Sequence, residues 1–203
     1  MTATRSTPTV FTVGHSTLEI VAFVSLLKQY GIEAVADVRS SPYSQHNPQF
    51  NREALQASLK RAGIQYVFLG RELGARRSEP ECYVDGQAQY DRIANLPLFK
   101  DGLQRLVEGA SLMHVALLCA EKEPLDCHRC ILVCRHLKTM IPDIRHILGD
   151  GSLETHKQAE GRLLKQFKLT TEDLLRSEAD TLDAAYDQQG KRIAYKEETV
   201  LQP

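Results

Sequence analysis

The sequence predicts an α/β fold in a single domain: a mostly parallel sheet of about five strands with helices on both faces, in a Rossmann-like three-layer arrangement, and additional C-terminal helices. Short β-rich runs alternate with segments of helical periodicity, the pattern of a helix-covered parallel sheet with right-handed crossovers. Residues 113–119 are almost continuously apolar, as expected of a strand buried on both faces. The 203 residues, 42% of them hydrophobic, suffice for one well-buried core.

The first two strands and the helix between them have clear local signals. Residues 10–14 form a short β-rich run. Residues 19–30 carry apolar side chains at the i, i+3, i+4 and i+7 positions of an amphipathic helix, and Gly31 follows them. Residues 32–38 form a second buried-strand run. The polar, proline-containing segment 40–48 is predicted to be a loop.

The middle of the chain repeats this alternation. Asn51 is expected to cap a helix over residues 51–62, and Gly63 to end it. Residues 64–69 are the third strand. Residues 70–89 are rich in glycine, proline and charge, which indicates a long loop or lid rather than regular structure.

The remaining core elements follow in the same order. A helix is predicted over residues 90–108, and the buried strand 113–119 comes next. After a loop over residues 120–126, a helix is expected over residues 127–140 and a short fifth strand over residues 144–148.

The chain divides into three regions in this interpretation. Residues 1–150 form the α/β core, and residues 151–190 form a C-terminal helical extension packed on the same domain, with helices over 155–167 and 171–185. Residues 191–203 are polar and are expected to be a loose tail.

Composition argues against several classes of function, although a local basic patch for nucleic acid stays possible. The formal net charge is -1, so no overall positive field favours binding to a nucleic acid. No apolar run approaches the ~20 residues needed to cross a bilayer, and the N-terminus lacks the apolar core of a signal peptide. We therefore expect a cytoplasmic protein without a membrane partner, whose five cysteines stay reduced.

Polar and reactive residues follow four of the predicted strands. They are His15 and Ser16; Asp37, Arg39, Ser40 and Ser44; Gly70; and Cys119, Glu121, Cys127, His128 and Arg129. Because ligands bind outside the carboxyl ends of parallel strands, we expect these residues to converge on one cleft.

Part of this set is suited to binding an anion. A guanidinium at the end of a buried strand, such as Arg39, needs a carboxylate or an anionic ligand. The predicted substrate-binding residues are Ser16, Arg39, Ser40, Ser44, Gly70 and Arg129. The structural alternatives are that Asp37 pairs with Arg39 and that Ser16 or Thr17 caps the helix that follows.

The other part is suited to catalysis. With Asp126 as the N-cap, Cys127 would lie in the first turn of a helix, where the helix dipole lowers the pKa of a thiol. The predicted catalytic residues are His15, Asp37, Glu121, Cys127 and His128, with either histidine as general base. The structural alternative is that the cysteines are small core residues and that Arg129 pairs with Glu121.

A metal site is the weaker interpretation of the cysteines. Cys119, Cys127, Cys130 and Cys134 fall close together. However, Cys127, Cys130 and Cys134 share an apolar helical stripe that is expected to face the core, and a second Cys-x-x-Cys pair is missing. No metal is therefore predicted. The glycine-rich nucleotide motifs are absent as well, so the cofactor is unknown.

Five motifs in order resemble a known family. They are Gly14-His15-Ser16; Asp37-Val38-Arg39-Ser40-x-Pro42-x-Ser44; Phe50-Asn51; Tyr66-x-x-Leu69-Gly70-x-x-Leu73-Gly74; and Cys119-x-Glu121-x-x-x-x-x-Cys127-His128-Arg129. Together they resemble domain-of-unknown-function family 488 of bacterial and archaeal proteins. The resemblance implies an α/β fold with the motif residues in one pocket, but it does not indicate which activity the protein has.

Three functions remain open at this point. The first is an enzyme, a hydrolase or transferase, that binds an anionic small molecule such as a nucleotide or a phosphorylated metabolite. The second is a non-catalytic ligand sensor or nucleic-acid accessory module, in which the basic segment 71–77 contacts the phosphates of the nucleic acid. The third is a metal-binding protein. The substrate and the oligomeric state do not follow from the sequence.

Overall fold

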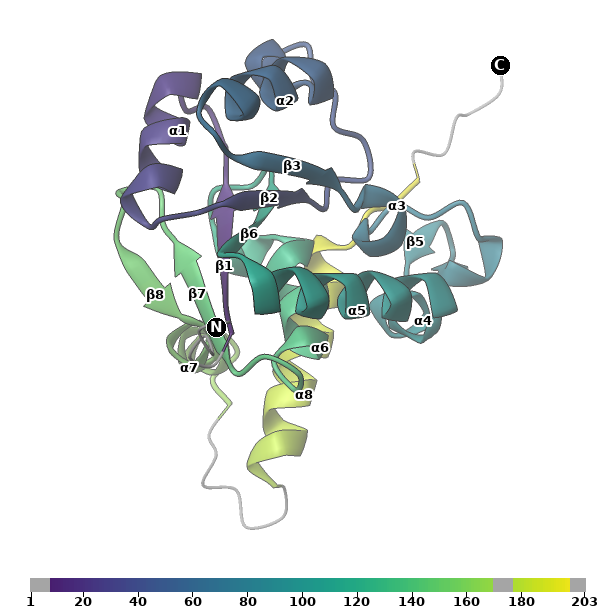
Figure 1. Cartoon of the computed structure of the whole chain (residues 1–203). Coiled ribbons are helices and arrows are strands. Elements are labelled where there is room, and N and C mark those ends of the chain that lie inside the picture. Colours follow the sequence, from purple (N-terminus) through teal and green to yellow (C-terminus); the bar gives the residue numbers. More distant parts are fainter. Residues whose placement is uncertain (1–7, 170–176, 198–203) are drawn as a thin grey trace, which may run out of the picture.

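A computed structural model describes residues 8–169 and 177–197, and it has the predicted α/β fold. Its main sheet has six strands in the order β3-β2-β6-β1-β7-β8 (Figure 1). The strands are β1 (Thr9–Gly14), β2 (Ala34–Asp37), β3 (Gln65–Phe68), β6 (Val115–Cys119), β7 (Asp143–Ile147) and β8 (Leu153–Thr155). The first five are mutually parallel, and β8 is antiparallel to β7. The sheet therefore extends past residue 150.

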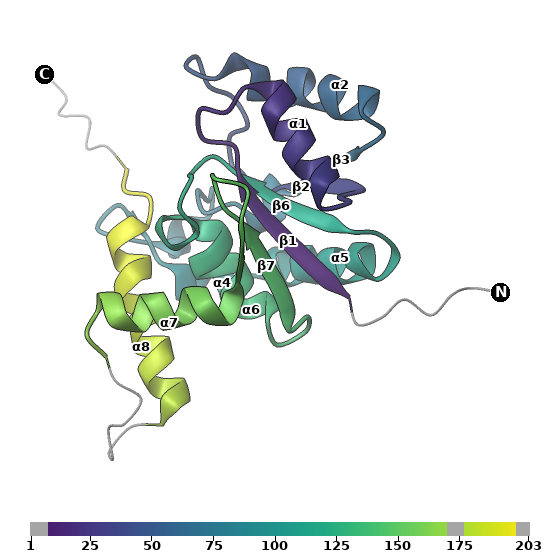
Figure 2. The same cartoon turned by 90° about the vertical axis from the view of Figure 1, so that its left-hand side faces the viewer.

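Helices cover both faces of the sheet (Figures 1 and 2). On one face lie α1 (Ile20–Gln29) and α2 (Arg52–Arg61). On the other lie α5 (Pro97–Leu112) and a π-helix (Arg129–Cys134) that continues into α6 (Arg135–Leu137). Side chains alternate along β2 between a core cluster on each face. This alternation makes a three-layer structure.

The strand order brings three carboxyl ends together. Strand β6 lies between β1 and β2, with Gly14 beside Cys119 and Asp37 beside Leu118. The ladder continues past the strands, because the His15 amide donates to the Cys119 carbonyl at 3.0 Å. Segments far apart in sequence thus end side by side at one edge of the sheet.

The prediction of a structureless segment over residues 70–89 is wrong. This segment contains α3 (Gly70–Leu73), a 3-10 turn (Pro80–Cys82) and a hairpin of β4 (Tyr83–Val84) and β5 (Gln87–Ala88). The hairpin turn is Asp85-Gly86, with φ of +49° and +72°. Asp-Gly is a strong signal for a two-residue hairpin turn, because both residues need positive φ.

Two predicted helices differ in detail. The helix expected over residues 90–108 is α4 (Tyr90–Asn95) followed by α5. Leu96 between them is extended, at φ -62° and ψ 136°, because the proline at residue 97 disfavours helical backbone before it. The helix expected over residues 127–140 is mostly π-helical, and it is preceded by a 3-10 turn (Pro124–Asp126). Asp126 is therefore not its N-cap.

The C-terminal helices pack on the core through their own apolar cluster. Helix α7 (His156–Gln166) begins with a capping box between Thr155 and Gln158. Helix α8 spans Glu178–Ile193, and Lys196 after it forms an isolated antiparallel β-bridge with Gln87. The helix thus extends into the region predicted to be a tail from residue 191. The first residues of the helix predicted over 171–185, and residues 198–203, lie outside the described residues.

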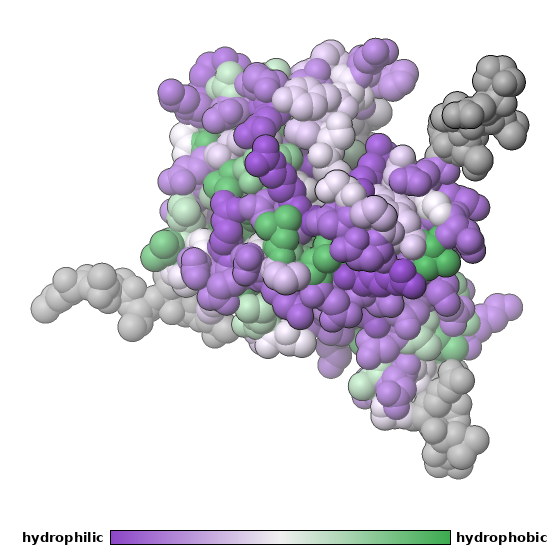
Figure 3. Space-filling model, turned by 90° about the vertical axis from the view of Figure 1, so that its right-hand side faces the viewer, coloured by the Kyte–Doolittle hydropathy of each residue, from purple (hydrophilic) through white to green (hydrophobic). Residues whose placement is uncertain are grey.

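Among the described residues, no helix is both long and apolar enough to span a bilayer. The face shown in Figure 3 is mostly hydrophilic, and its hydrophobic atoms form small, separate patches. On this side the molecule therefore offers a polar surface.

Candidate active site

A cavity of about 340 Å³ opens at the carboxyl ends of β2 and β6. Its walls come from the loops after these strands, from the segment after α3, and from α4 and the C-terminal segment. The lining residues are Arg39, Ser40, Ser41, Tyr43, Ala75, Arg76, Tyr90, Cys119, Ala120, Glu121, Asp126, His128, Ile193 and Tyr195. This volume is that of a small-molecule site.

Arg39 is the most tightly positioned side chain of the wall. Its Nε and Nη2 donate to the two carboxylate oxygens of Asp37, at 2.8 and 2.6 Å. Nη2 also donates to the Phe50 carbonyl at 3.0 Å. Asp37 is fully buried and also accepts a hydrogen bond from the Tyr66 hydroxyl. A buried bidentate pair of this kind fixes the guanidinium where the cavity begins.

His15 supports Arg39 from the side. Its Nδ1 lies 2.9 Å from the Ser16 carbonyl, so this nitrogen carries the proton. Its Nε2 is then free to accept from Nη1 of Arg39, at 3.2 Å. Burial lowers the pKa of His15, and so does the charge of Arg39. The neutral ring, stacked on Phe50, therefore holds the arginine and does not line the cavity.

A thiol and an imidazole face each other at the end of β6. The Cys119 sulfur lies 3.6 Å from Nδ1 of His128. The other ring nitrogen, Nε2, lies 3.0 Å from the Val38 carbonyl, to which it can only donate. In the neutral ring Nδ1 is therefore unprotonated and can accept from the thiol. This tautomer is the one that a general base for Cys119 requires.

A second thiol lies directly behind the first. The Cys127 sulfur is 3.0 Å from a carboxylate oxygen of Glu121 and accepts the backbone N–H of Arg129 at 3.4 Å. Cys127 is 1% exposed and Cys119 is 2% exposed, but of the two only Cys119 lines the cavity. The donor atoms of Cys119, Glu121, Cys127 and His128 all lie within 4.8 Å of one another.

A buried arginine provides the charge beneath this cluster. Arg129 is fully buried, and its guanidinium donates to the carbonyls of Glu121 at 2.6 Å and Lys122 at 3.2 Å. Within the described part of the chain it makes no ion pair with a carboxylate, and its Nε has no hydrogen-bond partner. A buried cation without a counterion is costly, so the adjacent cluster must hold a negative charge.

The titration of the cluster follows from this arrangement. Burial raises the pKa of the Cys127 thiol, but the Cys119 thiol, Arg129 and His128 lower it by more, so it ends well below its usual value. Burial and the neighbouring Cys127 raise the pKa of Cys119. Burial and Cys127 also raise the pKa of Glu121. Burial lowers the pKa of His128, but the neighbouring Cys127 and Glu121 raise it by more. The negative charge that Arg129 requires is therefore held within the cluster of Cys119, Glu121 and Cys127.

The same four residues have the chemistry of a metal site. Two sulfurs, one imidazole nitrogen and one carboxylate oxygen are ligands that zinc accepts. The hydrogen bond from His128 to the Val38 carbonyl is also the usual outer contact of a metal-binding histidine. With Zn²⁺, two thiolates, a carboxylate and Arg129 would make the centre neutral.

The residues predicted from the sequence fall into three groups. Cys119, Arg39, Ser40, Glu121 and His128 line the cavity. His15, Asp37, Cys127 and Arg129 lie behind these residues and hold them. Ser16, Ser44 and Gly70 are not part of the wall.

The residues outside the wall have local structural contacts. The Ser44 hydroxyl accepts from the backbone amides of His46 and Asn47. A Cβ on Gly70 would lie 2.1 Å from the Arg39 carbonyl, so only glycine permits this close approach. The alternative that Arg129 pairs with the Glu121 carboxylate is also not observed, because its partner is the carbonyl of that residue.

Sequence reasoning missed part of the cavity wall. Tyr90 comes from a helix that was assigned no role, and Ile193 and Tyr195 come from the region expected to be a tail. Arg76 stacks its guanidinium on the Tyr195 ring, 4.5 Å from its centre. Tyr195 in an otherwise polar stretch was the available signal, but its position depends on how α8 packs.

One comparison with known proteins gives a match. A family model described as "Domain of unknown function DUF488" matches residues 19–135, more than half of the chain. No curated protein and no solved structure matches. The match includes Arg39, Cys119, Cys127 and His128.

Proposed function

The chain belongs to the DUF488 family of domains of unknown function, and from the geometry of its cavity we propose that it is an enzyme that attacks a bound small molecule with a cysteine thiol. The observation that carries this proposal is the contact between the Cys119 sulfur and Nδ1 of His128, whose other nitrogen is fixed on a carbonyl. A nucleophile beside an oriented base is the arrangement of nucleophilic catalysis.

The two thiols have different roles in this proposal. Cys119 faces the cavity and is the nucleophile, and Cys127 holds the negative charge behind it. In the first step the Cys119 proton passes to Nδ1 of a neutral His128, and a bond forms from the Cys119 sulfur to the substrate. The bond between the substrate and its leaving group breaks, and the leaving group departs with that proton. Water or a second substrate then releases the covalent intermediate, which gives a hydrolase or a transferase.

An anionic group on the substrate would be held by the arginines of the cavity wall. Arg39 and Arg76 come from the segments after β2 and α3, and the Ser41 hydroxyl lies between them in sequence. Glu121 and Asp126 come from the segment after β6. A wall with cations and carboxylates on different segments orients a substrate by its charge.

Two alkylating reagents of equal reach test both parts of the proposal. Iodoacetate carries a negative charge and iodoacetamide does not. We expect the ratio of the iodoacetate rate to the iodoacetamide rate to be higher for Cys119 than for free glutathione, because the arginines attract the anion. Tryptic cleavage after Lys122 separates Cys119 from Cys127, so mass spectrometry identifies the thiol that reacts.

Arg76→Gln is the test variant, and Arg105→Gln is its control. Arg76 lines the cavity and is exposed, so its loss should reduce the preference for iodoacetate without unfolding the protein. Arg105 is a surface residue on α5 that pairs with Glu72, and its loss should change nothing. If the ratio of the two rates is the same for glutathione and for wild-type Cys119, the cavity does not bind anions. If Cys119 does not react with either reagent, it is not the nucleophile.

A zinc enzyme built on the same four residues is a second candidate. The fixed tautomer of His128 and the charge of Arg129 favour it, as described above. Elemental analysis of reduced protein purified without chelators separates the two candidates. One zinc per chain that is lost in Cys119→Ser and Cys127→Ser would replace the thiol mechanism by zinc-assisted hydrolysis, whereas zinc-free protein with a reactive Cys119 supports the thiol.

A further inference from the structure

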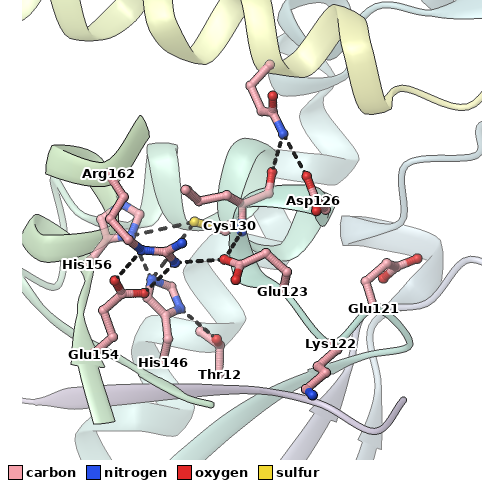
Figure 4. Close-up of polar contacts among 12 residues, drawn as sticks. Thr12, Glu121, Lys122, Glu123, Asp126, Cys130, His146, Glu154, His156 and Arg162 are labelled. Carbon is pink, nitrogen blue, oxygen red and sulfur yellow. Dashed lines mark hydrogen bonds and ion pairs between the residues drawn. The ribbon is translucent and has the colours of Figure 1, made fainter. Parts of the chain in front are cut away.

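A second group of metal-ligating side chains lies apart from the cavity. Cys130 on the π-helix, His146 on β7 and His156 at the start of α7 point toward one another (Figure 4). All three are at least 96% buried. Figure 4 shows Glu121, which belongs to the cavity, well away from this group. The proposed function uses none of these three residues.

The three donor atoms form a triangle of suitable size. Nε2 of His146 and Nδ1 of His156 are 3.0 Å apart, and the Cys130 sulfur is 3.9 Å from each nitrogen. Metal ions lie about 2 Å from imidazole nitrogens and about 2.3 Å from thiolate sulfur. An ion at these distances would lie between the donors and close to their plane, which is a trigonal site.

The outer nitrogens of both rings are also engaged. Nδ1 of His146 lies 2.8 Å from the Thr12 hydroxyl, and Nε2 of His156 lies 2.9 Å from the Tyr186 hydroxyl. Tyr186 in turn donates to Glu160 at 2.8 Å. The Thr12 hydroxyl can accept from Nδ1 of His146, and the Tyr186 hydroxyl can accept from Nε2 of His156. Outer contacts of this kind orient metal-binding histidines.

We propose that Cys130, His146 and His156 bind a monovalent, thiophilic metal ion, for which Cu⁺ is the best match. One thiolate and two neutral imidazoles around Cu⁺ make a neutral centre, whereas Zn²⁺ would leave a net positive charge in a buried site. Zn²⁺ also prefers a fourth ligand, while a trigonal set of one thiolate and two imidazoles suits copper. The ion would tie β7 and α7 to the π-helix.

The alternative is a hydrogen-bonded core without metal. The Thr12, His146, His156, Tyr186 and Glu160 side chains form a continuous chain in which each proton has an acceptor. In that case Cys130 contributes only packing. The two interpretations differ in what Cys130 does, because only the metal site needs its thiolate.

Titration with Cu⁺ under anaerobic conditions, against a chromogenic Cu⁺ chelator, tests the site. The background is the folded Cys119→Ser, Cys127→Ser double variant, which removes the thiols of the cavity cluster. We expect one Cu⁺ per chain, and a loss of affinity of about 100-fold or more when Cys130→Ser or His156→Gln is added. Circular dichroism verifies that these variants fold.

Cys134→Ser is the matched control. Cys134 lies one turn further along the same helix, is equally buried and is not part of the donor triangle, so its loss should leave Cu⁺ binding unchanged. No bound Cu⁺ in the background protein would overturn the proposal, as would equal loss in Cys130→Ser and Cys134→Ser. Displacement of Cu⁺ by equimolar Zn²⁺ would overturn the choice of ion. None of these results depends on the reactivity of Cys119.

Discussion

At the scale of single residues, Asp37 and Arg39 support the cavity wall by a buried ion pair, and Asp143 and Arg145 repeat the same Asp-x-Arg geometry at the surface. Both arginines donate from Nε and Nη2 to the two carboxylate oxygens. The first pair is 7% and 0% exposed and the second 44% and 33%. The chain therefore contains its own control for the effect of burial.

We predict that Asp37→Asn lowers the free energy of unfolding by about 3–5 kcal/mol, because it leaves the Arg39 charge buried without a counterion. Asp143→Asn should cost about 0–1 kcal/mol, since water screens the exposed pair. Urea unfolding of both variants measures these changes. Equal effects would mean that Arg39 does not depend on Asp37 as described.

His15 gives the fold a dependence on acid. Burial and Arg39 lower the pKa of His15 below its usual value, so between the two values the unfolded chain binds more protons than the folded one. Stability contributed by His15 is therefore complete above the unfolded pKa of about 6.5 and is lost as the pH falls through the folded pKa. We predict a shallower loss of stability below pH ~6.5 in His15→Gln than in wild type. Chemical unfolding at a series of pH values measures this difference, and identical pH profiles would contradict it.

The sequence identified most of these residues but not their division of roles. His15, Asp37, Arg39, Cys119, Cys127 and His128 were all selected because they follow strands. Which of them face the cavity depends on distances of a few ångströms between segments remote in sequence. The buried position of Arg129 is an example, because its partners are carbonyls that any residue type could supply.

At the scale of elements, Gly14 lies where the site constrains the backbone, and Gly161 lies where nothing does. A Cβ on Gly14, at the end of β1, would lie 1.8 Å from the carbonyl of Glu121, while a Cβ on Gly161 in α7 would meet nothing within 4 Å. Strand β1 and the loop after β6 therefore approach as closely as the backbone allows.

We predict opposite effects of replacing these glycines by alanine. Gly14→Ala should destabilise the protein by about 1–3 kcal/mol through overpacking and displace Glu121. Gly161→Ala should stabilise it by about 0.5–1 kcal/mol, because alanine loses less backbone entropy in a helix. Thermal unfolding compares the two, and a Gly14→Ala variant as stable as wild type would contradict the close approach.

The elements that sequence analysis predicted well are those with strong periodicity or buried apolar runs. The hairpin of β4 and β5 and the short strand β8 were missed, since two or three residues carry no periodic signal. The break at Pro97 and the turn at Asp85-Gly86 had local signals that would have located them. The extension of α8 past residue 190 had none, because its polar sequence resembles a tail until its packing is known.

At the scale of the whole molecule, the site exists only because of the strand order. β6, the fourth parallel strand along the chain, lies between the first two, and this places the Cys119 loop beside Arg39. The C-terminal helices then cover the side of the cavity with Ile193 and Tyr195. The alternating pattern predicted a parallel sheet with one functional edge, but the order of the strands within it cannot be derived from periodicity.

The reactivity of the five cysteines of the folded protein is the most direct test of this account. Native protein is treated briefly with iodoacetamide, and the labelled cysteines are identified by mass spectrometry. We predict that Cys119, which lines the cavity, is labelled first, and that Cys82, Cys127, Cys130 and Cys134, which are similarly buried but do not line it, are labelled only after unfolding. Labelling of Cys119 only on unfolding, at the rate of Cys82, would contradict a nucleophile at the cavity.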